Sequence, residues 1–100
     1  MKVQTEAIQF KADAKLLTRI DSKLGKLEKL FDRIISTQVK LKLENSGQVK
    51  DKILEAHLEV PGQVLSATAK DKTFESALDD VTDSLKRQLV KYKERLRNRS

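Results

Sequence analysis

The segment that decides the fold spans residues 37–70 and reads TQVKLKLENSGQVKDKILEAHLEVPGQVLSATAK. Its apolar side chains recur at every second position: Val39, Leu41 and Leu43, then Leu54, Ala56, Leu58 and Val60. A period of two is typical of half-buried strands. Asn45-Ser46-Gly47 supplies one turn, and Pro61-Gly62 fits the centre of a type II turn. We therefore expect three antiparallel strands, within residues 37–47, 50–60 and 63–70.

The opposite face of these strands is polar and mixed in sign. Its expected members are Lys40, Lys42, Lys52, Glu55, His57 and Glu59. Neither sign dominates this set, so we expect a face that is merely solvated.

Segments with helical periodicity lie before and after the three strands. In residues 13–34, apolar side chains recur at spacings of three and four: Leu17, Ile20, Leu24, Leu27, Phe31 and Ile34. The same period returns from Thr73: Phe74, Ala77, Leu78, Val81, Leu85, Leu89, Tyr92 and Leu96. Such spacings mark one face of a helix, and Asp13 suits the N-cap of the first.

The looser alternation of VQTEAIQF at residues 3–10 adds a first strand. The predicted class is α+β, with the order β-α-β-β-β-α and a four-stranded sheet. Each helix has one apolar stripe, so both should cover the same sheet face. We expect residues 1–100 to form a single domain, with the final RNRS frayed.

Charge is distributed unevenly along the chain. The stretch KRQLVKYKERLRNRS at residues 86–100 holds seven basic residues and one acid, a net of 7 − 1 = +6, which equals the net charge of the whole protein. Acidic residues in the first half of the last helix and cations in the second complement the helix dipole. That explains two or three cations in the last turn, but not seven over four turns. A polyanionic partner is therefore indicated.

The basic side chains form rows along both predicted helices. In the last helix, Arg87, Lys91 and Arg95 form one ridge, and Lys86, Lys93 and Arg97 form a second on the other flank of the apolar stripe. Basic residues also line the back of the first helix: Lys15, Arg19, Lys23, Lys26, Lys29 and Arg33. Groups four residues apart lie about 6 Å apart along a helix, which suits a phosphate backbone. The four aromatic residues all fall on apolar faces, so we expect recognition of phosphates and RNA shape rather than stacking on bases.

The chemistry of catalysis is not evident. The chain has no cysteine, its three glycines are isolated, and its one histidine, His57, lies between two glutamates on an exposed strand face. Asp79, Asp80 and Asp83 could hold a cation, but an acidic helix start more often compensates the dipole. We predict a protein that is not an enzyme and has no cofactor, metal or small-molecule substrate. No apolar run is long enough to span a membrane, and no secretory signal is evident, which predicts a cytoplasmic protein.

Three stretches resemble the ribosome hibernation promoting factors, also called ribosome-associated inhibitors, subunit-interface proteins or, formerly, sigma-54 modulation proteins. They are KLGKLEKLFDRI at 23–34, DKTFESALDDVTDSLKRQL at 71–89 and KYKERL at 91–96. The resemblance covers the whole chain, and its length matches the short form, which lacks a C-terminal dimerisation domain.

The resemblance implies a bacterial protein that binds the small ribosomal subunit and its rRNA between head and body. There it fills the channel of messenger and transfer RNA and inhibits translation under stress or in stationary phase. The RNA-binding residues it implies are Lys23, Lys26 and Lys29 on the first helix and Arg87, Lys91 and Arg95 on the last. Ser84 departs from the family, where lysine is frequent, and Lys86 and Lys93 are the cations that can compensate.

Two other functions are open to a chain of this kind, a general RNA-binding domain and a protein-interaction regulator. A double-stranded-RNA-binding domain needs a basic start to its last helix, whereas this one begins TFESALDDVTD. A protein-interaction regulator should expose an apolar patch, and the sequence does not show one.

Overall fold

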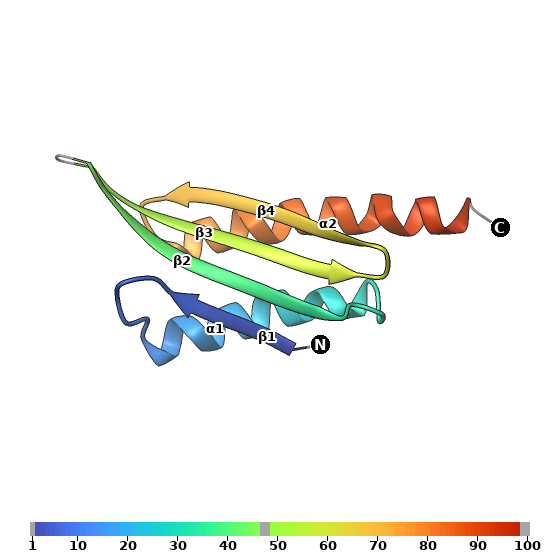
Figure 1. Ribbon diagram of the computed structural model, residues 1–100, viewed down its shortest axis with the longest axis horizontal. Coiled ribbons are helices and arrows are strands. Elements are labelled where there is room, and N and C mark those ends of the chain that lie inside the picture. The colour runs from blue at the N-terminus through green and yellow to red at the C-terminus, as the bar shows by residue number, and fades with distance from the viewer. Residues whose placement is uncertain (1, 47–48, 99–100) are drawn as a thin grey trace.

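The structure is a computed structural model that describes residues 2–46 and 49–98 (Figure 1). Seven elements make up the fold of these residues. They are β1 (Lys2–Ala7), α1 (Ala14–Gly25), the 3₁₀ helix η1 (Lys26–Lys29), β2 (Ser36–Ser46), β3 (Val49–Val60), β4 (Gln63–Asp71) and α2 (Phe74–Arg97). The predicted order β-α-β-β-β-α is confirmed.

The four strands form one sheet in the order β1-β2-β3-β4. β2, β3 and β4 are the expected antiparallel meander, with Leu41 opposite Leu54 and Leu58 opposite Leu65. β1 lies parallel to β2, with Thr5 opposite Val39. Parallel neighbours need a crossover between them, and α1 provides it.

Both helices cover one face of the sheet, as expected, and leave the other face open (Figure 1). The core lies between the layers, where Leu54 and Leu58 of β3 meet Ile20 and Leu24 of α1 and Leu85 of α2, all fully buried. The apolar stripe of α2 is buried from Phe74 to Tyr92. Because the core occupies one side of each helix, the cations of both helices are directed outward or along the flanks.

The first helix is shorter than the sequence predicts. α1 ends at Gly25 and tightens into η1, and residues 30–35 are irregular. Leu27, Phe31 and Ile34 are nevertheless buried. A 3₁₀ turn also repeats about every three residues, so the burial pattern continues after the α-helix has ended. At the start of α1 the buried side chain is Leu16 and not the predicted Leu17, which is only half-buried.

Two positions on the sheet also differ from expectation. Lys52 has the same parity as Leu54 and therefore belongs to the helix-facing side, while Ile53 lies on the open side. Leu43 is on the covered side but 44% exposed, since the end of the β2–β3 hairpin extends past the helices (Figure 1).

The sequence predicts a turn at Asn45-Ser46-Gly47, but Asn45 and Ser46 belong to β2, and Gly47 lies outside the described residues. Of the predicted frayed end RNRS, Arg97 is the last residue of α2 and Asn98 is its C-cap, while residues 99 and 100 lie outside the described residues.

Side-chain caps fix the starts of both α-helices, and a tight turn joins β3 to β4. The Asp13 carboxylate accepts a hydrogen bond from Leu16 N at 2.7 Å, which confirms the predicted N-cap, and the Thr73 hydroxyl caps α2 by accepting from Ser76 N at 3.1 Å. Gly62 has the φ of +85° that the third residue of a type II turn requires. The Tyr92 hydroxyl donates to Pro61 O at 2.6 Å, which ties this turn to α2.

Candidate nucleic-acid interface

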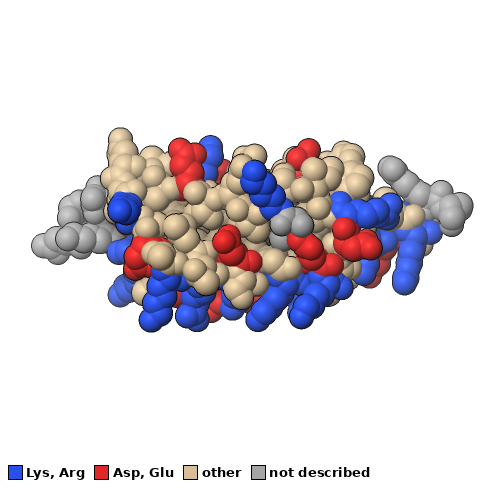
Figure 2. All heavy atoms as spheres, turned by 90° about the horizontal axis from the view of Figure 1, so that it is seen from below, with Lys and Arg blue, Asp and Glu red and all other residues tan. Residues whose placement is uncertain are grey.

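The outer side of the helix layer gathers most of the basic side chains. Figure 2 views the molecule from the edge where β1 and α1 lie, and Lys and Arg side chains line its lower border, which is the helix layer. Lys15 and Arg19 of α1 and Lys26 of η1 are exposed, as are Lys86, Arg87 and Lys91 of α2. The packing of both apolar stripes on one sheet face therefore turns two separate basic rows into one surface.

A shallow hollow of about 680 Å³ runs along α1. Its lining is Ala14, Lys15, Thr18, Arg19, Ser22, Lys23 and Lys26. Four of these seven side chains are cations, two are hydroxyls that can donate hydrogen bonds, and none is acidic. Cations and hydroxyls are the groups that contact phosphate oxygens in nucleic-acid complexes. Lys15 and Arg19 belong to this surface although the sequence prediction did not select them.

Lys23 is not a free cation. Its ammonium group forms an ion pair with Asp79 of α2, which links the two helices across 56 residues of sequence. The two side chains are 37% and 54% exposed, so solvent screens the pair and its contribution to stability is small. The ion pair has a larger consequence for binding, because the Asp79 carboxylate contacts the ammonium group that a phosphate would otherwise contact.

The basic residues of α2 lie on two opposite flanks. Asp79, Lys86 and Lys93 are seven residues apart and so share one stripe, and this stripe faces α1: Asp79 contacts Lys23, and Lys93 lines a hollow together with Lys29. Of the sequence-predicted residues, Lys29 and Lys93 are therefore brought together, Lys23 contacts α2 through Asp79, Lys86 lies on the stripe of α2 that faces α1, and Lys26 lines the hollow along α1.

Arg87, Lys91 and Arg95 follow the other flank. On that side Gln88 donates a hydrogen bond to Ser66 O of β4 at 2.8 Å, and Arg95 lines a small hollow with Pro61 and Gln63. This ridge begins on the outer surface at Arg87 and approaches the β3–β4 turn at Arg95. It borders the basic surface but does not face α1.

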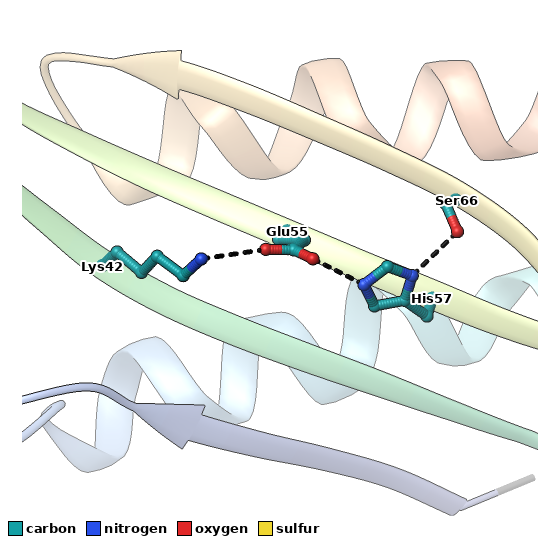
Figure 3. Close-up of polar contacts among 4 residues, drawn as sticks. All are labelled: Lys42, Glu55, His57 and Ser66. Atoms are coloured by element: carbon teal, nitrogen blue, oxygen red, sulfur yellow. Dashed lines mark hydrogen bonds and ion pairs between the residues drawn. The ribbon is translucent and has the colours of Figure 1, made fainter.

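The open sheet face has a different electrostatic character. Figure 3 shows Lys42, Glu55, His57 and Ser66 in one chain of contacts. Glu55 accepts from Lys42 at 3.2 Å and contacts His57 Nε2 at 2.7 Å, and His57 Nδ1 lies 2.7 Å from the Ser66 hydroxyl. The hydrogen bond from His57, followed by that from Lys42, holds the pKa of Glu55 below its usual value. Lys42 is thus paired with Glu55 on this face, and Lys70 is paired there with Glu44 and Asp51.

The same chain has the residue types of a Ser-His-Glu triad, but its surroundings do not suit catalysis. An acyl-transfer site needs hydrogen-bond donors beside the serine for the oxyanion. Ser66 lies in the middle of β4, and its carbonyl oxygen accepts from Gln88. We interpret the chain as a set of cross-strand contacts that order the sheet face.

Two further kinds of site are not evident in the part of the chain that the structure describes. No group of three or more His, Cys, Asp or Glu residues there is placed to hold a metal ion. No helix among those residues is long and apolar enough to cross a membrane.

A mixed four-stranded sheet, with one face covered by two helices that carry rows of basic side chains and the other face carrying cross-strand ion pairs, defines a small α+β domain suited to a polyanion. The sequence profile of the family described as sigma 54 modulation protein / S30EA ribosomal protein matches residues 3–97. The chain belongs to this family, whose curated relatives carry the name ribosome hibernation promoting factor.

Individual relatives agree with this assignment. The ribosome hibernation promoting factor of Azotobacter vinelandii is 37% identical over 95 residues, which are 95% of this chain and 85% of the relative. That of Klebsiella oxytoca is 37% identical over 78 residues, 78% of each chain. A ribosomal subunit interface protein from Coxiella burnetii has the same fold, with a TM-score of 0.84 at 22% identity over 94% of this chain and 99% of that one. The N-terminal domain of Thermus thermophilus Protein Y has a TM-score of 0.68 at 19% identity over 91% and 94%.

Proposed function

We propose that this protein is a cytoplasmic ribosome hibernation factor that contacts the rRNA of the small ribosomal subunit and inhibits translation under stress or in stationary phase. The observation that carries the proposal is the row of Lys and Arg side chains along the helix layer of a chain that belongs to the hibernation factor family. The names of the relatives, which refer to ribosome hibernation and the ribosomal subunit interface, support the ribosome as the partner.

The proposed contacts are the eight residues that the sequence selects: Lys23, Lys26, Lys29, Lys86, Arg87, Lys91, Lys93 and Arg95. Lys29, Lys86 and Lys93 lie on the sides by which the two helical segments face one another, Lys26 lies on the adjoining hollow along α1, and these four form the proposed centre of the interface. Arg87, Lys91 and Arg95 flank it. Lys23 contributes least in the wild type, because Asp79 keeps its ammonium group paired.

Binding through phosphates explains how the protein would inhibit translation without catalysis. A rigid basic surface that fills the channel between head and body of the small subunit excludes messenger and transfer RNA from it. No chemical step is required, and none is proposed. Because each phosphate contact releases a counterion, affinity should fall steeply with salt, by about 0.7 to 0.9 in log affinity per contact for each tenfold increase.

The test is sedimentation of the purified protein with isolated small and large subunits, combined with a cell-free translation reaction. The proposal predicts co-sedimentation with the small subunit at low and moderate salt, release at high salt, and repression of translation. Protein that stays at the top of the gradient at every salt concentration would contradict it. Equal binding to small subunits and to unrelated RNA duplexes would favour a general RNA-binding domain instead.

A further inference from the structure

A second hollow, of about 490 Å³, lies between the segment after η1 and the last turns of α2. Its lining is Glu28, Lys29, Leu30, Phe31, Asp32, Arg33, Lys93, Leu96 and Arg97. This volume is within the ~300–1,000 Å³ typical of small-ligand clefts. The two walls are more than 50 residues apart in sequence and meet because both helices pack on one sheet face.

Unlike the hollow along α1, this one has an apolar wall as well as cations. Leu30, Phe31 and Leu96 line it, and the first and last are only partly buried. Four cations and two acids surround them, so the hollow has a net charge of 4 − 2 = +2. A ligand with both an apolar surface and negative charge is complementary to such a site, whereas a bare phosphate would leave the apolar wall unused.

Arg33 gives the hollow a flat face. Its guanidinium group lies 5.1 Å from the centroid of the Phe31 ring. Phe31 is in turn held edge-on against Tyr92, with ring centroids 5.4 Å apart and an interplanar angle of 87°. Phe31 is buried while Arg33 is exposed. A guanidinium plane held in this way is one of the surfaces on which proteins stack unpaired RNA bases.

We propose that this hollow holds one unstacked nucleotide of single-stranded RNA. The base lies against Arg33 and the apolar side chains Leu30 and Leu96, and the adjoining phosphates contact Lys29 and Lys93. The inference rests on the proposed function in that RNA is the partner, and it adds that the partner includes an unpaired nucleotide at this point. It also modifies the expectation, drawn from the aromatic residues, that bases are not stacked.

The test compares two arginine-to-lysine variants that keep every charge. Arg33→Lys removes the planar group at the hollow, and Arg19→Lys makes the same change in the hollow along α1. The probes are a labelled single-stranded oligoribonucleotide of about ten nucleotides, within the site sizes of single-strand-binding folds, and a duplex of the same sequence. Fluorescence anisotropy at several salt concentrations measures affinity, and thermal melts check that each variant is folded.

The proposal predicts that Arg33→Lys weakens single-strand binding about fivefold or more, the lower part of the range for one base stack, with an unchanged salt slope. Arg19→Lys should change it less than about twofold, because a lysine still contacts phosphate. A strand with 2-aminopurine at one position should change its fluorescence on binding the wild type but not Arg33→Lys. Equal behaviour of the two variants, or equal loss on the duplex, would overturn the proposal.

These results are independent of the sedimentation experiment. If the protein binds small subunits while Arg33→Lys binds single strands normally, the hollow does not hold a base and the proposed function stands. If the protein fails to bind ribosomes but Arg33→Lys selectively loses single-strand affinity, the proposed function fails and the hollow is a nucleotide site.

Discussion

Replacing Asp79 with asparagine should make the protein bind RNA more tightly, because it releases a cation that the fold keeps paired. Asp79 is the partner of Lys23 across the two helices. Asparagine has nearly the same shape but no charge, so the Lys23 ammonium becomes available to a phosphate. The change should cost little stability, since exposed ion pairs contribute about 0.2–1 kcal/mol.

The size of the gain follows from the salt dependence of phosphate contacts. One added contact contributes about 0.7 to 0.9 in log affinity for each tenfold dilution of salt. If the variant and the wild type bind equally at ~1 M salt, the variant should bind roughly five- to eightfold more tightly than the wild type at ~0.1 M. Its salt slope should be steeper by the same amount, about 0.7 to 0.9. The assay is a salt titration of binding to purified small subunits.

Two controls separate this mechanism from a general change in net charge. Asp80→Asn removes the same charge from an exposed neighbour that lies about 100° further around the helix, and it should have a smaller effect. In a Lys23→Gln background, Asp79→Asn should give no gain, because the cation it releases is absent. If Asp79→Asn binds no more tightly than the wild type, or gains equally without Lys23, then Lys23 does not contact RNA and the reasoning is refuted.

Three further predictions concern the fold. Leu85→Ala should cost about 2–5 kcal/mol in urea unfolding, because Leu85 is fully buried between α2 and the sheet; a cost below 1 kcal/mol would contradict this packing. Gly62→Ala should cost about 1–2 kcal/mol, since Gly62 has φ +85° and nothing lies within 4 Å of an added Cβ; no loss would show that the turn adopts another conformation. Glu55→Gln should cost about 1 kcal/mol at pH 7. The pKa of Glu55 is lowered in the folded state from 4.5, so its contribution is complete above about pH 4.5 and is lost as the pH falls through the folded value. The cost should therefore shrink towards pH 3, and a cost that is equal at pH 7 and pH 3 would argue against the ionised contact.

The strands and α2 could be predicted because each has a clean period over many residues. Val39 to Val60 alternates around a single turn, and the apolar stripe of α2 continues for five turns from Phe74 to Tyr92. The end of α1 could not be predicted, because Leu27 and Phe31 stay buried whether the chain is α-helical or 3₁₀. The partner of β1 could not be predicted either, since an alternating strand fits either edge of a meander.

The basic character of the site could be predicted, but its internal arrangement could not. Residue spacing separates the two ridges of α2, yet only packing decides which of them faces α1. The pair between Lys23 and Asp79 and the meeting of Lys29 with Lys93 both depend on contacts between distant segments. Arg33 carried no special signal in the sequence, because its position over the Phe31 ring depends on how the chain packs after η1.

The most direct test of the central claim compares the two faces of the molecule at equal charge. One variant replaces Arg87, Lys91 and Arg95 of the helix layer with glutamine, and the other replaces Lys2, Lys40 and Lys70 of the open sheet face. All six side chains are exposed, so both variants should remain folded, and each lowers the net charge by three.

Affinity for purified small subunits, measured across salt concentrations, is the decisive quantity. At ~0.1 M salt, the helix-layer variant should bind about two to three powers of ten more weakly than the wild type, taking the two affinities as equal at ~1 M. Its salt slope should fall by about 2 to 3. The sheet-face variant should bind nearly as the wild type does. Equal losses in the two variants, or a larger loss from the sheet face, would contradict the claim that the helix layer contacts the ribosome.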